Sequence, residues 1–469
     1  MALPDAPRHG RCVRAAHPRI ARSLMRPRRL APLLLAIAGC ALRPAGEDEE
    51  RDRIEAAGRV YAEDAAAPAL PGAPSVEDYL RVAFAGNAEL RRRYEEWRAA
   101  IEQVPQDSSF PDAALSFGYL MRGGGMKAWD RTTLGIGNEP MVMIPYPGKL
   151  AAAGRRALEE ARAAGLEFEA ARFDLQERVR AAYLDLALFG ESIRLQEERV
   201  RLDEMKAAQA HAAVGLGRAA PEAALVARTE LDLARSDLES LHAAVGPARA
   251  AMNALLGRAV EAPVPLPDAL PAPRALPRTD AEVLALGAER NPALGALART
   301  VAGREDALDL ARQAYIPDVS LSFSLTGSAS QAVGAMATLP LRLEAIAASI
   351  RQAEAGVRAA EAARTQYARD LAARFVLDLA VLRNDERQVE LFETAIIPRI
   401  RRTIDLARAG YAAGRTDFAA LLAAERTHID ARVAVARLRI EREKALAAVE
   451  AAAAVDIETL RPAGAQPAS

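Results

Sequence analysis

A helix–turn–helix pattern that occurs twice constrains this chain more than any other feature. In residues 398–429 a helical pattern ends at Gly410, turns through the segment YAAGRTD and resumes at Phe418. The second copy lies upstream, where residues 217–225 match residues 414–422 at an offset of 197. A long helical hairpin repeated at this distance indicates an internal duplication, so we expect two similar halves in one body rather than unrelated domains.

Two further pairs of segments support the duplication. The segments FPDAALSFGY from Phe110 and IPDVSLSFSL from Ile316 share Pro-Asp followed by Leu-Ser-Phe. Upstream of each, the residues around Asn87 correspond to those around Asn291. Each half therefore has the order helix, strand segment, long helix, glycine turn and helix.

This doubled order of motifs resembles the TolC-like outer-membrane efflux protein family, over roughly residues 75–456. The resemblance implies a mainly α fold with a small β part, in which duplicated long coiled-coil hairpins form an α-barrel. It also implies four strands per chain that contribute to a trimeric 12-strand transmembrane β-barrel, because four short strands cannot close a barrel alone. No cofactor is implied. The segment MVMIPYPGKL is similar to the strand-to-helix corner of heavy-metal efflux members.

The first 39 residues are typical of an export signal, with eight arginines and one aspartate before a short apolar run. Either Met1 or Met25 can be the start, because the arginines after Met25 suffice as a basic region. The tetrad Ile-Ala-Gly-Cys that ends at Cys40 resembles the bacterial lipoprotein cleavage box, which implies lipidation of Cys40. Ala41 after it resembles lipoproteins sorted to the outer membrane. An ordinary signal peptide followed by a chance cysteine is the alternative.

Composition and charge exclude several classes of protein. Aromatic residues are only 4% and apolar residues reach 51%, which favours long packed helices over an aromatic-rich sandwich. No run of 18 apolar residues follows Cys40, so the sequence predicts no transmembrane helix. The formal net charge of −1 becomes −8 once the basic signal is removed, which argues against nucleic-acid binding. Cys12 lies in the signal, so the mature chain has no internal disulfide.

These observations divide the chain into six segments. Residues 41–74 are acidic and rich in alanine, proline and glycine, which is typical of an extended tether. The sequence alone leaves undecided whether residues 54–61 form a short strand or helix. The segments are the signal peptide 1–39, the lipidated N-terminal tether 40–74, the first efflux-protein repeat 75–260, the Pro-rich linker 261–279, the second repeat 280–456 and a disordered tail 457–469.

Each repeat should begin with a helix followed by two short strands. The first helix should run from Ser75 to Val104 and end at Pro105, and its counterpart should span residues 280–314. Alternating apolar residues predict the strands. They lie at residues 113–119 and 131–136 in the first repeat, and at 319–326 and onward through 339 in the second.

The long helices follow these strands. The helical pattern continues from Lys149 to Ala213, about 95 Å at 1.5 Å per residue, and the return helix ends at Gly257. The matching helix of the second repeat should span residues 341–410, with a kink about one turn before Pro398. Its return helix should span residues 418–455. Heptad spacing of apolar residues predicts antiparallel coiled-coil packing for both hairpins.

No catalytic constellation is present, so we do not expect an enzyme. The histidines outside the signal lie on predicted helices without paired ligand spacing, and nucleotide-binding and nucleophile motifs are absent. Four methionines cluster around the first strand pair, and their thioethers suit soft ions such as Cu(I), although packing is the simpler role. They are Met121, Met126, Met141 and Met143. No other metal site is expected.

The two glycine tips are the stronger candidates for a functional site. In the family such tips line the closed periplasmic end and dock an adaptor protein, although glycines that only reverse the helix are the simpler alternative. Some members ring the aperture with acidic residues, but Ala420 and Ala423 occupy those positions here, so Asp417 or Arg415 would supply the charge. The matching docking positions are Val214, Gly215, Leu216, Gly217, Tyr411, Gly414 and Arg415.

The function that the resemblance implies is the outer-membrane channel of a tripartite efflux system, a passive exit duct for small molecules or metal ions. Its expected partners are two further copies of the chain, a periplasmic adaptor, an inner-membrane efflux transporter and outer-membrane lipid. A periplasmic adaptor lipoprotein is one alternative, but such proteins carry one hairpin, not two. A non-channel coiled-coil structural lipoprotein is another, but it would not need the doubled strands. Strand pairs in separate sheets would contradict the channel hypothesis.

Overall fold

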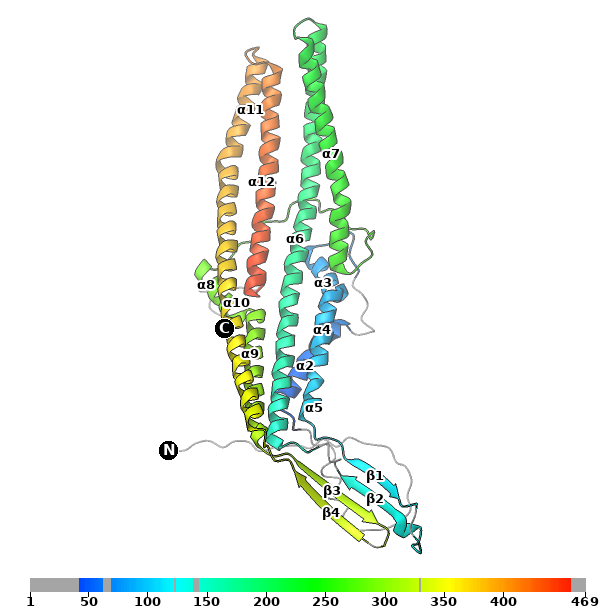
Figure 1. The fold of residues 1–469 in the computed structure, drawn as a ribbon. Helices are drawn as coiled ribbons and strands as arrows, with labels where there is room; N and C mark the ends of the chain where they lie inside the picture. The colour runs from blue at the N-terminus through cyan, green and yellow to red at the C-terminus, as the bar shows by residue number, and fades with distance from the viewer. Residues whose placement is uncertain (1–41, 62–68, 122–123, 138–142, 329, 457–469) are drawn as a thin grey trace, which may run out of the picture. The chain divides into compact units, whose positions relative to one another are not determined.

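The computed structural model describes residues 42–61, 69–121, 124–137, 143–328 and 330–456. The expected signal, the expected lipidation site Cys40, the tail 457–469 and Met141 lie outside these residues. Helices dominate the described chain (Figure 1), and none of them is both long and apolar enough to cross a bilayer. The α-helices are α2 (Glu47–Gly58), α3 (Val76–Gly86), α4 (Ala88–Ile101), α5 (Gln103–Ser108), α6 (Pro147–Gly215), α7 (Pro221–Leu256), α8 (Asp280–Arg290), α9 (Pro292–Arg312), α10 (Leu343–Leu391), α11 (Ile397–Ala412) and α12 (Phe418–Ala453).

Helix α6 is the element on which the others pack. It has 69 residues and therefore extends about 100 Å at 1.5 Å per residue, which confirms the predicted uninterrupted helix. Pro147 lies in its first turn, where a missing amide proton leaves no hydrogen bond unmade. Helix α6 contacts α4 and α7 of its own repeat and α9 and α12 of the second repeat. The two repeats are thus joined along this one helix.

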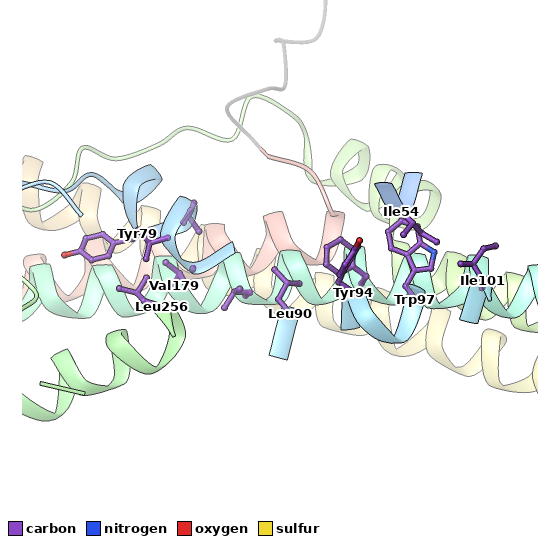
Figure 2. Packing of buried hydrophobic residues seen from close by; sticks show 14 of the residues in the cluster. Ile54, Tyr79, Leu90, Tyr94, Trp97, Ile101, Val179 and Leu256 are labelled. Carbon is purple, nitrogen blue, oxygen red and sulfur yellow. The ribbon is translucent and has the colours of Figure 1, made fainter. Parts of the chain in front are cut away.

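The largest buried cluster lies along α6, where α2, α3 and α4 cover it (Figure 2). The Trp97 ring stacks on that of Phe168 with centroids 5.8 Å apart, and its indole nitrogen donates to Glu50 Oε1 at 2.9 Å. The second repeat has a smaller cluster, in which four apolar residues of its long helix are buried. They are Leu371, Phe375, Leu379 and Leu382.

The four strands form one antiparallel sheet in the order β1-β2-β3-β4. The central pairing joins the two repeats, with Leu134 opposite Leu325 and Ile136 opposite Phe323. The expectation that both strand pairs share a sheet is therefore confirmed, and β1 and β4 are its edges. The strands are β1 (Ala114–Tyr119), β2 (Thr132–Gly137), β3 (Val319–Thr326) and β4 (Ser330–Ala337).

The expectation of single helices at residues 75–104 and 280–314 is wrong. The first is broken at Asn87 and again between α4 and α5, and Pro105 lies inside α5 rather than ending a helix. The second is broken at Asn291 in the same way. Each asparagine has a non-helical backbone and caps the helix that follows it. Asparagine favours such a cap because its side chain competes for backbone hydrogen bonds.

Both asparagines also hold the end of a return helix. The Asn87 side-chain oxygen accepts from the amide three residues on at 3.0 Å, and its Nδ2 donates to the Leu255 carbonyl at 2.9 Å. Asn291 makes the same two bonds, with the Ala452 carbonyl at 2.9 Å. Each entry helix is therefore fastened to the last turn of its own hairpin.

Part of the expected tether is folded, which corrects that interpretation. Helix α2 packs on α4 and α6 and buries Ile54. Two carboxylates in its first turn, Glu47 and Glu50, are also buried. The helix left open for residues 54–61 thus begins earlier, at Glu47. Its apolar periodicity is weak because charged residues supply much of its buried face.

The predicted kink before Pro398 is a π-helical turn. Helix α10 passes into the π-turn η4 (Phe392–Ile396), which continues as α11. Three short 3-10 turns complete the described elements. They are η1 (Arg59–Tyr61), η2 (Trp129–Arg131) and η3 (Gln313–Tyr315).

Candidate functional site at the hairpin tips

The two hairpin tips have the same backbone conformation. Gly217 and Gly414 adopt left-handed φ angles of +67° and +66°. The glycine amides donate to the carbonyls three residues earlier, Val214 at 2.9 Å and Tyr411 at 3.0 Å, and the next amide reaches back five residues at 2.8 Å in both tips. A residue with a Cβ would adopt this conformation at a cost of about 1 kcal/mol. Glycine therefore favours the reversal at both tips.

Both tips are open to a partner. Leu216 is 69% exposed and Tyr411 is 48% exposed. No atom lies within 4 Å of a Cβ built on Gly215, Gly217 or Gly414. The predicted docking residues therefore lie in two exposed turns with matching geometry, and docking itself stays a prediction.

The tips differ in how the return helix begins. Asp417 caps α12, because its Oδ1 accepts from the Ala420 amide at 2.8 Å. The rings of Tyr411 and Phe418 lie 5.3 Å apart beside this cap. In the first tip Ala220 is the cap residue and offers no side-chain bond. One oxygen of Asp417 is thus already engaged, so the predicted aperture charge would come from its other oxygen or from the exposed Arg415.

Below the tips, the two hairpins meet through α6 and α12. Four apolar side chains make a small buried cluster there, and a groove of about 830 Å³ lies beside it. Beside this cluster, Arg432 of α12 pairs with Glu198 of α6 at 2.5 Å, and Arg426 of α12 lies 3.8 Å from Glu230 of α7. The cluster consists of Leu195, Leu202, Leu422 and Ile429.

Two titratable groups in this contact are removed from water. Asp203 of α6 is 2% exposed, and its burial raises its pKa although Arg426 opposes the shift. Burial lowers the pKa of His428 on α12, and the Arg432 charge adds to that effect. The His428 Nε2 atom is buried and makes no hydrogen bond. Both groups are therefore more easily held neutral in the packed hairpins than in water.

Farther from the tips, a buried ion-pair network joins the linker to both repeats. Glu450 of α12 accepts from Arg180 of α6 and from Arg274 of the linker, the latter at 2.9 and 3.0 Å. Glu443 accepts from Arg274 Nε at 3.1 Å. The sequence analysis missed this network. The sequence did contain one indication of it. Glu443 and Glu450 are seven residues apart, and each lies three residues after an apolar residue of the heptad pattern.

The three of these methionines that the structure describes do not gather into one site. Met121 and Met126 lie in the loop between β1 and β2, whereas Met143 lies beyond the other end of β2. A strand of six residues separates these positions by about 20 Å. Within the residues that the structure describes, no group of three His, Cys, Asp or Glu side chains is arranged to hold a metal ion.

The sequence comparison and the structural comparison agree with each other. The sequence profile of the outer membrane efflux protein family matches residues 284–455. No curated protein sequence gives a significant match. Among solved structures, the outer-membrane channel OprN has a TM-score of 0.66 and 21% identity, covering 82% of this chain and 90% of its own.

Two further structures have the same fold. The outer membrane protein VceC of Vibrio cholerae has a TM-score of 0.66 and 17% identity, covering 81% of this chain and 96% of its own. The MtrE outer membrane channel of Neisseria gonorrhoeae, in its open state, has a TM-score of 0.64 and 18% identity, covering 81% of this chain and 89% of its own. At these identities the likeness concerns the fold, and it spans both repeats.

Proposed function

We propose that the protein, whose residues 284–455 match the outer membrane efflux protein family, is the outer-membrane exit channel of a tripartite efflux system. It forms a homotrimer that gives passage to small molecules or metal ions and performs no chemistry itself. An inner-membrane transporter supplies the energy, and a periplasmic adaptor connects the two. The strands lie in the outer membrane and the helices in the periplasm.

The observation that carries this proposal is a sheet that is incomplete in one chain. Its edge strands β1 and β4 have no partner strand among the described residues. Large apolar side chains on these edges face water, with Leu115 79% and Val333 82% exposed. Three copies supply twelve strands, and closing them into a barrel pairs every edge and turns one face toward lipid.

The decisive experiment is crosslinking of the purified mature protein in detergent, followed by conductance measurements in planar bilayers. We expect crosslinked trimers that conduct. Monomers or dimers without conductance would contradict the channel and favour a periplasmic adaptor or a structural lipoprotein. Trimers that assemble but do not conduct would favour the structural lipoprotein over the adaptor.

We also propose that a lipid on Cys40 anchors the chain. The described chain begins at Leu42, whose amide donates to the Ser108 carbonyl at 3.1 Å, at the end of α5. Cys40→Ser should abolish labelling by a radioactive fatty acid, and continued labelling would mean that the cleavage box was misinterpreted.

The exposed tips are the surfaces that we assign to the adaptor. Gly217→Pro together with Gly414→Pro should leave trimers assembled but reduce export, because proline cannot adopt the positive φ that both turns require. The readouts are crosslinking and a growth assay of the complemented deletion strain against metals, dyes and antibiotics. Loss of the trimer would count against tip docking, since it would show that the turns serve assembly.

A further inference from the structure

The two faces of the sheet differ in the size of their side chains. On one face, Leu115, Ile136, Phe323 and Val333 lie side by side, since each is directly opposite the next across the four strands. All four are exposed. Alternate residues of a strand share a face, so large apolar side chains continue along it in both directions. We call this the apolar face.

The opposite face carries small side chains, many of which end in a hydroxyl group. Ser116, Gly135, Ser324 and Ala332 form one row across the four strands. In the next row, the hydroxyl groups of two opposed threonines of β2 and β3 hydrogen-bond to each other at 3.0 Å. On this face, only Met336 has a side chain larger than threonine among the strand residues, all of which are described. We call this the small face.

Serine hydroxyls lie over glycines on the small face. A Cβ built on Gly334 would come within 2.6 Å of the Ser322 hydroxyl oxygen on the neighbouring strand. A Cβ on Gly135 would likewise meet the hydroxyl of Ser116, which is directly opposite. The small face is therefore low, and its outermost atoms are largely hydroxyl oxygens.

The strands carry no charge. Every residue of β1 to β4 is described, and none is Asp, Glu, Lys or Arg. Two charged residues directly border the strands, Arg131 and Asp318. The Arg131 guanidinium lies over the ring of Tyr119, a residue of the apolar face, at 5.4 Å from the ring centroid. Asp318 accepts from Lys149 Nζ at 2.7 Å, so its charge is offset.

We propose that the small face is the inner wall of the outer part of the exit channel, and that this wall is electrically neutral and passes cargo of either charge equally. The inference rests on the proposed function, in which three sheets close into a barrel. Large apolar side chains of such a barrel face lipid, so the small face lines the lumen. Its short side chains leave room for bulky cargo. Any preference for one sign of charge then arises along the helices.

Thiol modification of trimers in lipid nanodiscs tests the wall. Ser324→Cys places a thiol on the small face, and Phe323→Cys places one beside it on the apolar face. The wild type gives the background, because Cys40 is the one cysteine after the expected signal. The probes are a cationic and an anionic methanethiosulfonate of similar size.

We expect Ser324→Cys to react with both probes. Its ratio of cationic to anionic rates should match that of a small free thiol within about threefold, because a neutral wall creates little local potential. Phe323→Cys should react at least about tenfold more slowly with each probe, because lipid covers it.

A matched variant shows whether the assay detects charge. Ser322→Asp, added to Ser324→Cys, places a carboxylate two residues away on the same face in every copy. It should shift the rate ratio about tenfold toward the cationic probe. Should this variant fail to assemble, Ser330→Asp, which lies diagonally across from Ser324 on β4, should shift the ratio in the same direction.

A rate ratio for Ser324→Cys beyond about threefold of the free thiol would overturn the neutral wall. Faster modification of Phe323→Cys than of Ser324→Cys would overturn the assignment of the faces. Conductance in planar bilayers separates this inference from the proposed function. Conducting trimers with a charge-dependent ratio keep the channel and reject the neutral wall, whereas non-conducting monomers in which both thiols react reject the channel and the wall together.

Discussion

The two repeats of this chain have the same order of elements but different interiors. In the first, aromatic rings cover α6, and Trp97 stacks on Phe168. In the second, Phe375 packs against Gly287, where a Cβ would approach the ring to 2.3 Å. The polar contacts and turns at the helix ends agree much more closely between the two repeats. The asparagine caps and the glycine tips have nearly identical distances and angles in both repeats.

This difference teaches which contacts fix the architecture. Apolar cores tolerate different side chains as long as volume and pattern are kept. A hydrogen bond between a capping amide and one carbonyl fixes a direction and a distance, so it defines how each entry helix meets its return helix. The repeats can therefore diverge in packing while their helices meet in the same way.

The largest expected effect contrasts the two cores. Trp97→Ala should lower the free energy of unfolding by about 4–5 kcal/mol, because it empties a buried site and also removes the donor to Glu50. Phe375→Ala should cost about 3–4 kcal/mol, since it removes no hydrogen bond. Denaturant unfolding followed by circular dichroism measures both. A larger loss of unfolding free energy for Phe375→Ala than for Trp97→Ala would show that the aromatic cluster is not the more stabilising core.

A second contrast compares a buried ion pair with an exposed one. Glu450→Gln should cost about 3 kcal/mol, because it leaves the buried Arg180 and the linker Arg274 facing a neutral group. The matched control is Glu198→Gln at the distal pair, whose side chains are 34% and 37% exposed, and it should cost less than about 1 kcal/mol. Similar costs in the same unfolding assay would show that the linker network is not the firmer joint.

Substitution of the two capping asparagines should have a smaller effect, and it tests directly whether the two repeats are energetically equivalent. Asn87→Ala and Asn291→Ala each remove a helix cap and a bond to a return-helix carbonyl, so each should cost about 1–2 kcal/mol. The two losses should agree within about 0.5 kcal/mol. A clear inequality would mean that the joints differ in energy despite their equal geometry.

The smallest effect concerns pH and the contact between the hairpins. Burial raises the pKa of Asp203 above its ordinary value of 3.8, so its stabilising protonated form is lost as the pH rises from 3.8 through the raised pKa. Asp203→Asn should remove this dependence and make the variant more stable than the wild type at neutral pH, by less than about 1 kcal/mol. Melting temperatures at pH 3.5 and pH 7 should show the gain only at the higher pH.

Much of this architecture follows from local pattern. The long helices, the glycine tips and the strands could be predicted because periodicity and turn chemistry act over a few residues. The break at Asn87 could not be predicted, because this asparagine fixes the helix end only when the Leu255 carbonyl lies beside it. Helix α2 was hidden for a similar reason, since its buried Glu50 is satisfied by Trp97, a partner 47 residues away.

The candidate site was predictable in position but not in detail. Both tips were identified from their glycines, yet the cap made by Asp417 depends on where α12 begins. The linker network was missed because Arg274 lies in a Pro-rich segment with no periodicity. The π-turn between α10 and α11 was also missed, since Pro398 indicated a kink but not a change in the type of helix.

The unpaired edges of the sheet have a consequence for how the protein is made. Under the proposed function, a newly exported chain carries two open strand edges, and any other extended segment can add to them. In the proposed trimer, pairing with the correct copies competes with aggregation, and both reactions speed up as chains accumulate. The yield of native assembly should therefore depend on the rate of export and on helpers that shield the strands until the copies meet.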